Sequence, residues 1–185
     1  IFNEIRRLPP GAFFERRAGA SRLGSYWSIR FTREEDPIDF AAERGAFLDI
    51  LRGAVRRELE SKRALGCFLS GGTDSSTVAG MLTKVLGRPA RTYSMGFEAH
   101  GYDEMEYARC AAQHFGTDHH EYYVTPEDVL DAVPRIAEVH ADPFANESAV
   151  PTYCCARLAA KDGVVRMLAG DGGDELFGGN QRYAT

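Results

Sequence analysis

The chain has 185 residues, 44% of them hydrophobic and 11% aromatic, which is enough apolar material for a buried core and argues against disorder. Its net charge of −5 offers no electrostatic footprint for nucleic acid, and no apolar run approaches membrane-spanning length. The four cysteines show no Cys-x-x-Cys or zinc-site spacing, and no signal peptide opens the chain, so we expect a soluble cytoplasmic protein.

The predicted secondary structure alternates between strands and helices. Residues 1–33 read as a turn-rich lead-in, with short strands expected around Gly11–Phe14 and Tyr26–Phe31. An amphipathic helix is predicted from about Asp39 to Lys62. The further predicted strands are 65–69, 90–97, 119–124 and 164–169, and the further helices are 75–86, 103–115, 126–139 and 147–161. This βαβ rhythm predicts an α/β fold with a doubly wound parallel sheet flanked by helices.

The most informative run is Leu-Ser-Gly-Gly-Thr-Asp-Ser-Ser at residues 69–76, between a predicted strand and a predicted helix. A glycine-rich turn at a helix start presents free backbone N–H groups where anions bind, and glycines let the chain approach an oxyanion closely. Hydroxyl donors and glycines fill the turn: Ser70, Gly71, Gly72, Ser75 and Ser76. Asp74 would repel a bare phosphate but suits a site in which Mg²⁺ lies between carboxylate and phosphate oxygens. The simpler alternative is a serine-capped turn at an ordinary helix start.

A second glycine-rich run follows the last predicted strand and reads Ala-Gly-Asp-Gly-Gly-Asp-Glu-Leu-Phe-Gly-Gly at residues 169–179. Two strands that end in glycine turns suggest a shared crevice at the carboxyl edge of a parallel sheet. Three acidic residues close together, Asp171, Asp174 and Glu175, are costly unless a cation or cationic substrate lies there. An acidic surface turn is one alternative, and a calcium loop is another, although the EF-hand spacing is not met.

These motifs carry a resemblance to a known family. The run at 69–76 lacks the lysine of a Walker-type loop and resembles the pyrophosphate loop of the N-type ATP pyrophosphatases, which share the adenine nucleotide alpha hydrolase-like fold. The run at 169–179 resembles a signature of the glutamine-hydrolysing asparagine synthetase B family. Segments such as Asp142–Asn146 and Ala149–Tyr153 are similar to bacterial members.

The resemblance implies a reaction and roles for individual residues. Family members join aspartate, ATP and ammonia from glutamine into asparagine, AMP and pyrophosphate through β-aspartyl-AMP. By this resemblance Asp74 and Asp174 would hold Mg²⁺, and Asp171 would deprotonate ammonium or orient the acyl acceptor. The remaining implied contacts to ATP come from Leu69, Ser70, Gly71, Gly72, Ser75, Ser76, Met95, Ala169 and Gly170, with Met95 near adenine. Ala169 departs from the serine that other members often carry.

The resemblance also implies that these residues are the middle of a longer chain. Residues 1–33 would be the tail of, and linker from, a glutaminase domain that acts in cis, and 34–185 a truncated ATP-pyrophosphatase domain. The family lysine that stabilises the transferring phosphorus would lie beyond Thr185, with Arg182 a speculative substitute. Three alternatives stay open: amidation of another carboxylate, a β-lactam or lasso-peptide-type cyclase, and a nucleotide-binding module without catalysis. A homodimer is also left open.

The adjacent pair His119–His120 could suggest a metal site. Because neighbours on a strand point to opposite faces of the sheet, the two rings cannot easily hold one ion. We therefore expect no metal there, and we expect Tyr122 and Tyr123 to serve strand packing.

Overall fold

A computed structural model describes residues 3–30, 38–60, 63–98, 105–140, 146 and 148–179, in two compact units formed by residues 1–40 and 41–185. Most of the segment 142–146, as well as Arg182, lies outside the described residues. Among the helices that the described residues form, none combines the length and the apolar character needed to cross a membrane.

The first unit contains a β-hairpin whose second strand lies earlier than predicted. β1 (Ala12–Arg17) pairs antiparallel with β2 (Ala20–Ser25), and only Ala18 and Gly19 connect them. Both connecting residues have positive φ, 46° and 84°, as a tight two-residue hairpin turn requires. The strand predicted at 26–31 is wrong over its described residues 26–30, because the chain has already paired with itself before reaching Tyr26.

The second unit is built on a parallel sheet of four strands in the order β5-β4-β3-β6. The strands are β3 (Leu65–Phe68), β4 (Arg91–Gly96), β5 (Asp118–Tyr123) and β6 (Arg166–Leu168). The helices are α1 (Phe40–Leu59), α2 (Thr73–Leu86), α3 (Met105–Phe115), α4 (Pro126–Val139), α5 (Ala149–Lys161) and α6 (Gly173–Phe177). Each predicted strand and helix of this unit is therefore present, with ends shifted by up to three residues.

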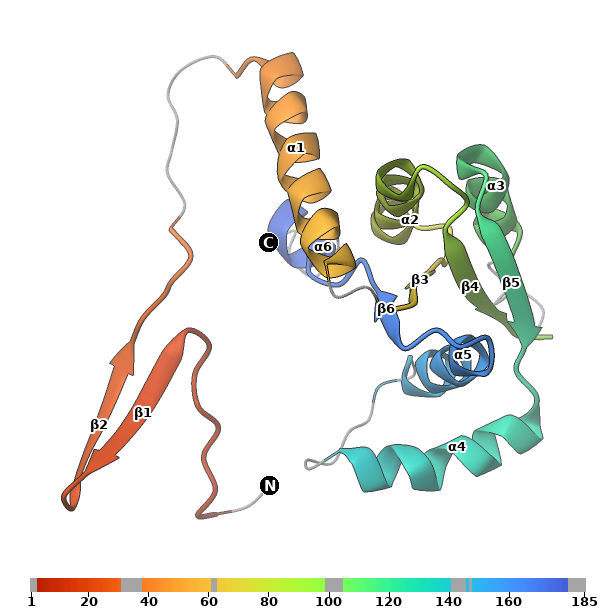
Figure 1. Ribbon diagram of the computed structural model, residues 1–185. Coiled ribbons are helices and arrows are strands. Elements are labelled where there is room, and N and C mark those ends of the chain that lie inside the picture. The colour runs from red at the N-terminus through yellow and green to blue at the C-terminus, as the bar shows by residue number, and fades with distance from the viewer. Residues whose placement is uncertain are drawn as a thin grey trace. The chain divides into compact units, whose positions relative to one another are not determined.

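Helices cover both faces of this sheet, which confirms the doubly wound arrangement (Figure 1). One core cluster packs α1, α2 and α3 around β3, with Cys67, Leu69 and Leu82 at most 2% exposed. The other packs α5 against the opposite face around Tyr93, and α4 lies against α5. Alternation along β4 explains the division, because Tyr93 and its neighbours in sequence project to opposite sides.

The strand order places a topological switch point between β3 and β6. From β3 the chain moves through α2 to β4 on one side, whereas β6 pairs with β3 on the other side. In open α/β sheets, ligands bind in the crevice outside the carboxyl ends of the strands at such a point. Both glycine-rich runs follow these two strands, so the fold brings them to the same edge as predicted.

Candidate functional site

The turn after β3, residues 69–76, which we name the first glycine turn, is closed by its own side chains. The hydroxyl oxygens of Ser70 and Ser75 lie 2.9 Å apart, the Ser70 N–H donates to Ser75 Oγ at 3.2 Å, and the Gly72 N–H donates to Ser70 Oγ at 3.3 Å. Gly72 is the N-cap of α2 and makes no side-chain cap hydrogen bond. The first N–H groups of α2 are thus without intrahelical acceptors and can bind an anion.

The two glycines of this turn lie in different surroundings. Gly71 has a φ of +85°, and a Cβ at this position would lie 2.5 Å from Ala108 N of α3. Gly71 therefore allows the turn to pack against α3. Gly72 has open space around it, with only Ser70 Oγ within 4 Å of an added Cβ. Of the two, Gly72 is the one that borders the cavity described next.

The second glycine turn, residues 169–175, faces the first across a cavity of about 830 Å³, the first cavity. Eight of the residues predicted to contact ligand or metal line it: Ser70, Gly72, Asp74, Ser75, Ala169, Gly170, Asp171 and Asp174. Leu69 and Met95 instead line a neighbouring second cavity of about 150 Å³. Gly71 and Ser76 are not among the described residues that line either cavity.

Glycines of the second turn fit directly against Asp74. A Cβ on Gly170 would lie 2.7 Å from Asp74 Cβ and 2.8 Å from Ser75 N, and a Cβ on Gly173 would overlap the Asp74 carboxylate. The two turns are therefore interlocked, and Asp74 lies beside the residue that precedes Asp174. Both carboxylates border the same cavity.

The charge of the first cavity indicates what it can hold. Four acidic residues line it, Asp74, Asp171, Asp174 and Glu175, and its described lining contains no lysine, arginine or histidine. A triphosphate alone would be repelled, whereas Mg²⁺ bound by one or two carboxylates and by phosphate oxygens would satisfy both partners. Among the described residues, no group of three or more His, Cys, Asp or Glu side chains is arranged to hold a metal ion. A Mg²⁺ ion that also binds the phosphates of a nucleotide commonly uses only one or two protein carboxylates.

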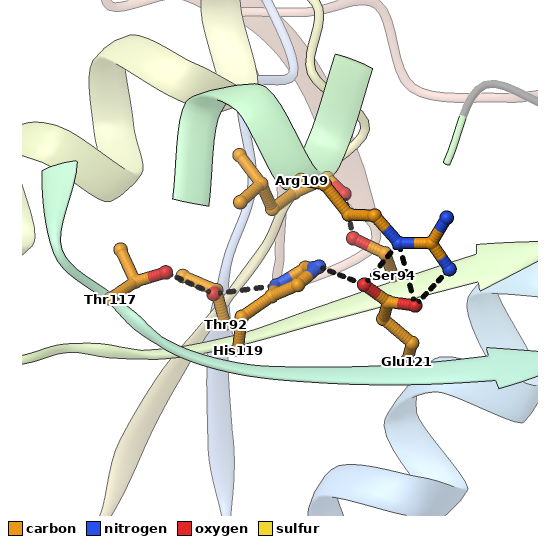
Figure 2. A network of polar contacts seen from close by, with 7 residues as sticks. Thr92, Ser94, Arg109, Thr117, His119 and Glu121 are labelled. Carbon is orange, nitrogen blue, oxygen red and sulfur yellow. Dashed lines mark hydrogen bonds and ion pairs between the residues drawn. The ribbon is translucent and has the colours of Figure 1, made fainter. Parts of the chain in front are cut away.

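A polar network braces the sheet and α3 behind the first glycine turn (Figure 2). Ser94 on β4 donates a hydrogen bond to the Leu69 carbonyl, which fixes the first residue of the turn. On β4 and β5, Thr92 Oγ1 lies 2.9 Å from His119 Nδ1, and His119 Nε2 lies 3.6 Å from Glu121. Glu121 in turn accepts three hydrogen bonds from Nε and one terminal nitrogen of Arg109 of α3. The helix that contacts Gly71 is thus tied to the sheet.

The two histidines have separate partners, as their alternation on β5 predicts. Burial lowers the pKa of His119, whose side chain is 10% exposed. His120 stacks on Tyr93 at 4.9 Å on the face that α5 covers, and its Nδ1 lies 3.3 Å from Asp162. The tyrosines of β5 serve packing and capping: Tyr122 donates a 2.8 Å hydrogen bond to Asp128 of α4, and Tyr123 packs against the first core cluster.

Comparison with known proteins identifies the family. The family model for asparagine synthase matches residues 46–185 of the chain. The chain belongs to the asparagine synthase family. It is 39% identical over 131 residues to a proposed glutamine-hydrolysing asparagine synthetase of Methanocaldococcus jannaschii, which covers 70% of this chain and 25% of that protein. It is 31% identical over 180 residues to glutamine-hydrolysing asparagine synthetase 1 of Bacillus subtilis, covering 97% of this chain and 28% of that protein.

Solved structures support the fold of this asparagine synthase family chain. An ammonia-dependent NAD synthetase from Campylobacter jejuni superposes with a TM-score of 0.50 at 13% identity, over 75% of this chain and 62% of that chain. The family predicted from the two glycine turns and the fold predicted from the alternation of strands and helices are therefore confirmed. The chain spans about a quarter of the length of the two curated relatives above.

The sequence did not single out two features of the site. Gly170 was predicted as a nucleotide contact and Gly173 only as part of a turn, yet both allow the close contact with Asp74. Thr152 of α5 lines the first and second cavities and also a third one of about 370 Å³. It lies in the segment Ala149–Tyr153, whose family likeness was the only available signal.

Proposed function

We propose that this chain forms the ATP-cleaving site of a glutamine-dependent asparagine synthetase. The observation that carries the proposal is the meeting of two acidic glycine turns, after β3 and β6, around one cavity at the switch point of the sheet. The first cavity would hold the pyrophosphate end of ATP, and the smaller second cavity would hold the adenosine end. Family membership supports an enzyme that forms a carbon–nitrogen bond at the expense of ATP.

The residues would divide the work by charge. Asp74 and Asp174 would hold Mg²⁺, which would supply positive charge to the pyrophosphate end of ATP. The N–H groups at the start of α2 and the hydroxyls of Ser70 and Ser75 would donate hydrogen bonds to the same oxygens. Leu69, Met95 and Gly170 would contact the nucleoside through the main chain, and the bond from Ser94 keeps the Leu69 carbonyl in place.

The proposed reaction has two steps. An oxygen of the aspartate side chain attacks the α-phosphorus, the bond from this phosphorus to the bridging oxygen breaks, and pyrophosphate leaves with the electron pair. Ammonia then attacks the acyl carbon and AMP departs. Asp171, which borders the first cavity, would accept the proton that ammonium must lose before it attacks.

The proposal extends to the rest of the protein. Residues 1–33 would belong to the end of a glutaminase domain and to its linker, and that domain would supply ammonia in a cytoplasmic enzyme.

The rival candidate is a nucleotide-binding module without catalysis. The absence of a lysine, arginine or histidine among the described residues that line the first cavity favours this rival.

Exchange of radiolabelled pyrophosphate into ATP separates the two candidates. A synthetase should catalyse exchange that requires both Mg²⁺ and aspartate, because the first step is reversible. A binding module should bind Mg·ATP in calorimetry and show no exchange. Exchange that requires a different carboxylate would instead indicate amidation or cyclisation of another substrate.

A further inference from the structure

Three cavities meet at a single side chain of the second unit. Thr152 is the one described residue that lines the first, second and third cavities. Phe68 and Ser70 border only the first two, and Asp171 borders only the first and third. The point where a phosphate chain, a nucleoside and a third molecule could all be in contact is therefore at Thr152.

Under the proposed function, this junction is where the reaction must occur. If the pyrophosphate lies in the first cavity and the nucleoside in the second, the α-phosphorus lies at their boundary. The attacking carboxylate must reach that phosphorus from the side opposite the leaving pyrophosphate. The third cavity opens at the same junction and carries the general-base candidate Asp171 on its border.

Charge favours the third cavity for an anionic substrate. Arg135 of α4 lines it and is the only lysine or arginine among the described residues that line the first, second and third cavities. Its one ion pair among the described residues is an exposed one with Glu138, at 3.7 Å, which leaves most of its guanidinium accessible to a ligand. The first cavity, in contrast, presents four carboxylates. An acid that carries a second anionic group would gain an ion pair in the third cavity and would meet repulsion in the first.

The Thr152 hydroxyl is available for this contact. Thr152 is exposed, and its side chain has no hydrogen-bond partner among the described residues; only its backbone N–H is used, donating to the Ser148 carbonyl. A hydroxyl can donate to a carboxylate or phosphate oxygen without a change of charge.

We propose that the third cavity binds the acid that becomes amidated, a small carboxylic acid with a second anionic group that pairs with Arg135, and that the Thr152 hydroxyl donates a hydrogen bond to the reacting carboxylate. This inference rests on the proposed function. It assigns a role to two residues that the glycine turns do not contain.

Cysteine protection maps the three cavities without requiring turnover. Cys110 is the exposed native thiol, whereas Cys67, Cys154 and Cys155 are buried, and burial raises the pKa of Cys67 and Cys155 to about 12. In a Cys110→Ala background, a small methanethiosulfonate reagent should therefore modify an introduced exposed thiol selectively. Thr152→Cys tests the junction. The matched positions are Glu175→Cys, which reports on the first cavity alone, and Ala156→Cys, which reports on the third alone.

Each ligand should protect a different set of positions. Mg·pyrophosphate should slow modification of Glu175→Cys and not of Ala156→Cys. L-Aspartate, added with Mg²⁺ and α,β-methylene-ATP, should slow modification of Ala156→Cys beyond any effect of the nucleotide alone. Modification of Thr152→Cys should be slowed by the nucleotide and further by L-aspartate. At a ligand concentration ten times its Kd, the rate should fall roughly tenfold, because the unliganded fraction falls to about one eleventh.

The outcomes distinguish the two proposals. Protection of Glu175→Cys by pyrophosphate, together with no effect of L-aspartate on Ala156→Cys, would overturn this inference and leave the proposed function standing. No protection of Glu175→Cys by Mg·ATP or Mg·pyrophosphate would overturn the proposed function itself.

Conservative variants give a second test of the proposal that does not depend on the introduced thiols. Thr152→Val should weaken L-aspartate binding roughly tenfold or more in calorimetry, and Thr152→Ser should restore it, because a donor to a charged group is lost and regained. Arg135→Gln should weaken L-aspartate binding, while Arg56→Gln on the exposed side of α1 should not. Equal L-aspartate affinity in Thr152→Val and Thr152→Ser would refute the hydroxyl contact.

Discussion

The substitution Gly173→Ala should damage the part of the site that we propose binds Mg²⁺ and leave the fold intact. A Cβ at this position would overlap the Asp74 carboxylate, and its nearest neighbours are the Oδ2, Cγ and Oδ1 atoms of that side chain. Gly173 does not have positive φ, so alanine can take its backbone conformation. The overlap is therefore relieved by rotation of the Asp74 side chain, at little cost in stability.

Rotation of Asp74 should appear as lost affinity for Mg·ATP. A charge-assisted contact of one carboxylate contributes roughly 1.5–3 kcal/mol, which corresponds to about one to two decades in Kd. Because the carboxylate is displaced and not removed, we expect the lower end, about tenfold. AMP binding should remain near the wild-type value, since AMP lacks the β- and γ-phosphates whose charge the proposed Mg²⁺ would neutralise. Isothermal titration with each nucleotide, with and without Mg²⁺, measures the difference.

The neighbouring substitution Gly172→Ala is the matched control. Gly172 has a φ of +94°, and no atom lies within 4 Å of an added Cβ. This variant should therefore lose about 1–2 kcal/mol of stability from backbone strain without moving Asp74. The reasoning fails if Gly173→Ala binds Mg·ATP as tightly as the wild type, or if it loses affinity for AMP by the same factor.

Four further changes test other parts of the structure. Asp74→Asn should weaken Mg·ATP binding by about one to two decades and spare AMP, and calorimetry showing unaltered affinity for both would contradict the metal role. Gly71→Ala should lower the urea midpoint by the equivalent of about 2 kcal/mol or more, from its positive φ and its overlap with α3, and an unchanged midpoint would argue against this packing role. Burial holds the pKa of His119 below its ordinary 6.5, so the unfolded chain takes up the proton more readily and stability falls as pH drops below about 6.5. His119→Gln should flatten that slope in thermal unfolding, and a slope equal to the wild type would count against it. Hydrogen bonds from Thr125 and Tyr122 hold the pKa of Asp128 below its ordinary 3.8, so stability is lost as pH falls below that value, and Asp128→Asn should remove this part of the acid dependence; an identical acid transition in the variant would refute it.

The sequence was sufficient for the architecture of the second unit because its signals are local. Apolar strands, amphipathic helices and the glycines at 87 and 116 each act within a few residues, and both glycines have positive φ just after a helix. The hairpin was misplaced because Ala18–Gly19 is a weak turn signal, whereas Tyr26 and Trp27 resemble strand residues. Neither aromatic residue is buried in the structure.

The site was predicted only where its chemistry lies in a short motif. The two acidic turns could be recognised from their residues, and the parallel strands placed them at one edge of the sheet. Their fit against each other could not be predicted, because it depends on the contact of Asp74 with Gly170 and Gly173, nearly a hundred residues away in sequence. Thr152 was missed for a similar reason: an exposed threonine in a helix carries no signal until the surrounding cavities are known.

The glycines of the second turn show that one motif can serve two physical requirements. Gly170 meets backbone and Cβ atoms of the first turn of α2, so a side chain there would force the two elements apart. The nearest neighbours of a Cβ on Gly173 are atoms of the Asp74 carboxylate, which can rotate away, so a side chain there would redirect the proposed metal ligand and leave the packing intact. The same run of small residues thus sets both the distance between the turns and the direction of Asp74. A site of this kind can lose its metal affinity without losing its fold, and nucleotide binding must be measured with and without Mg²⁺ to detect the loss.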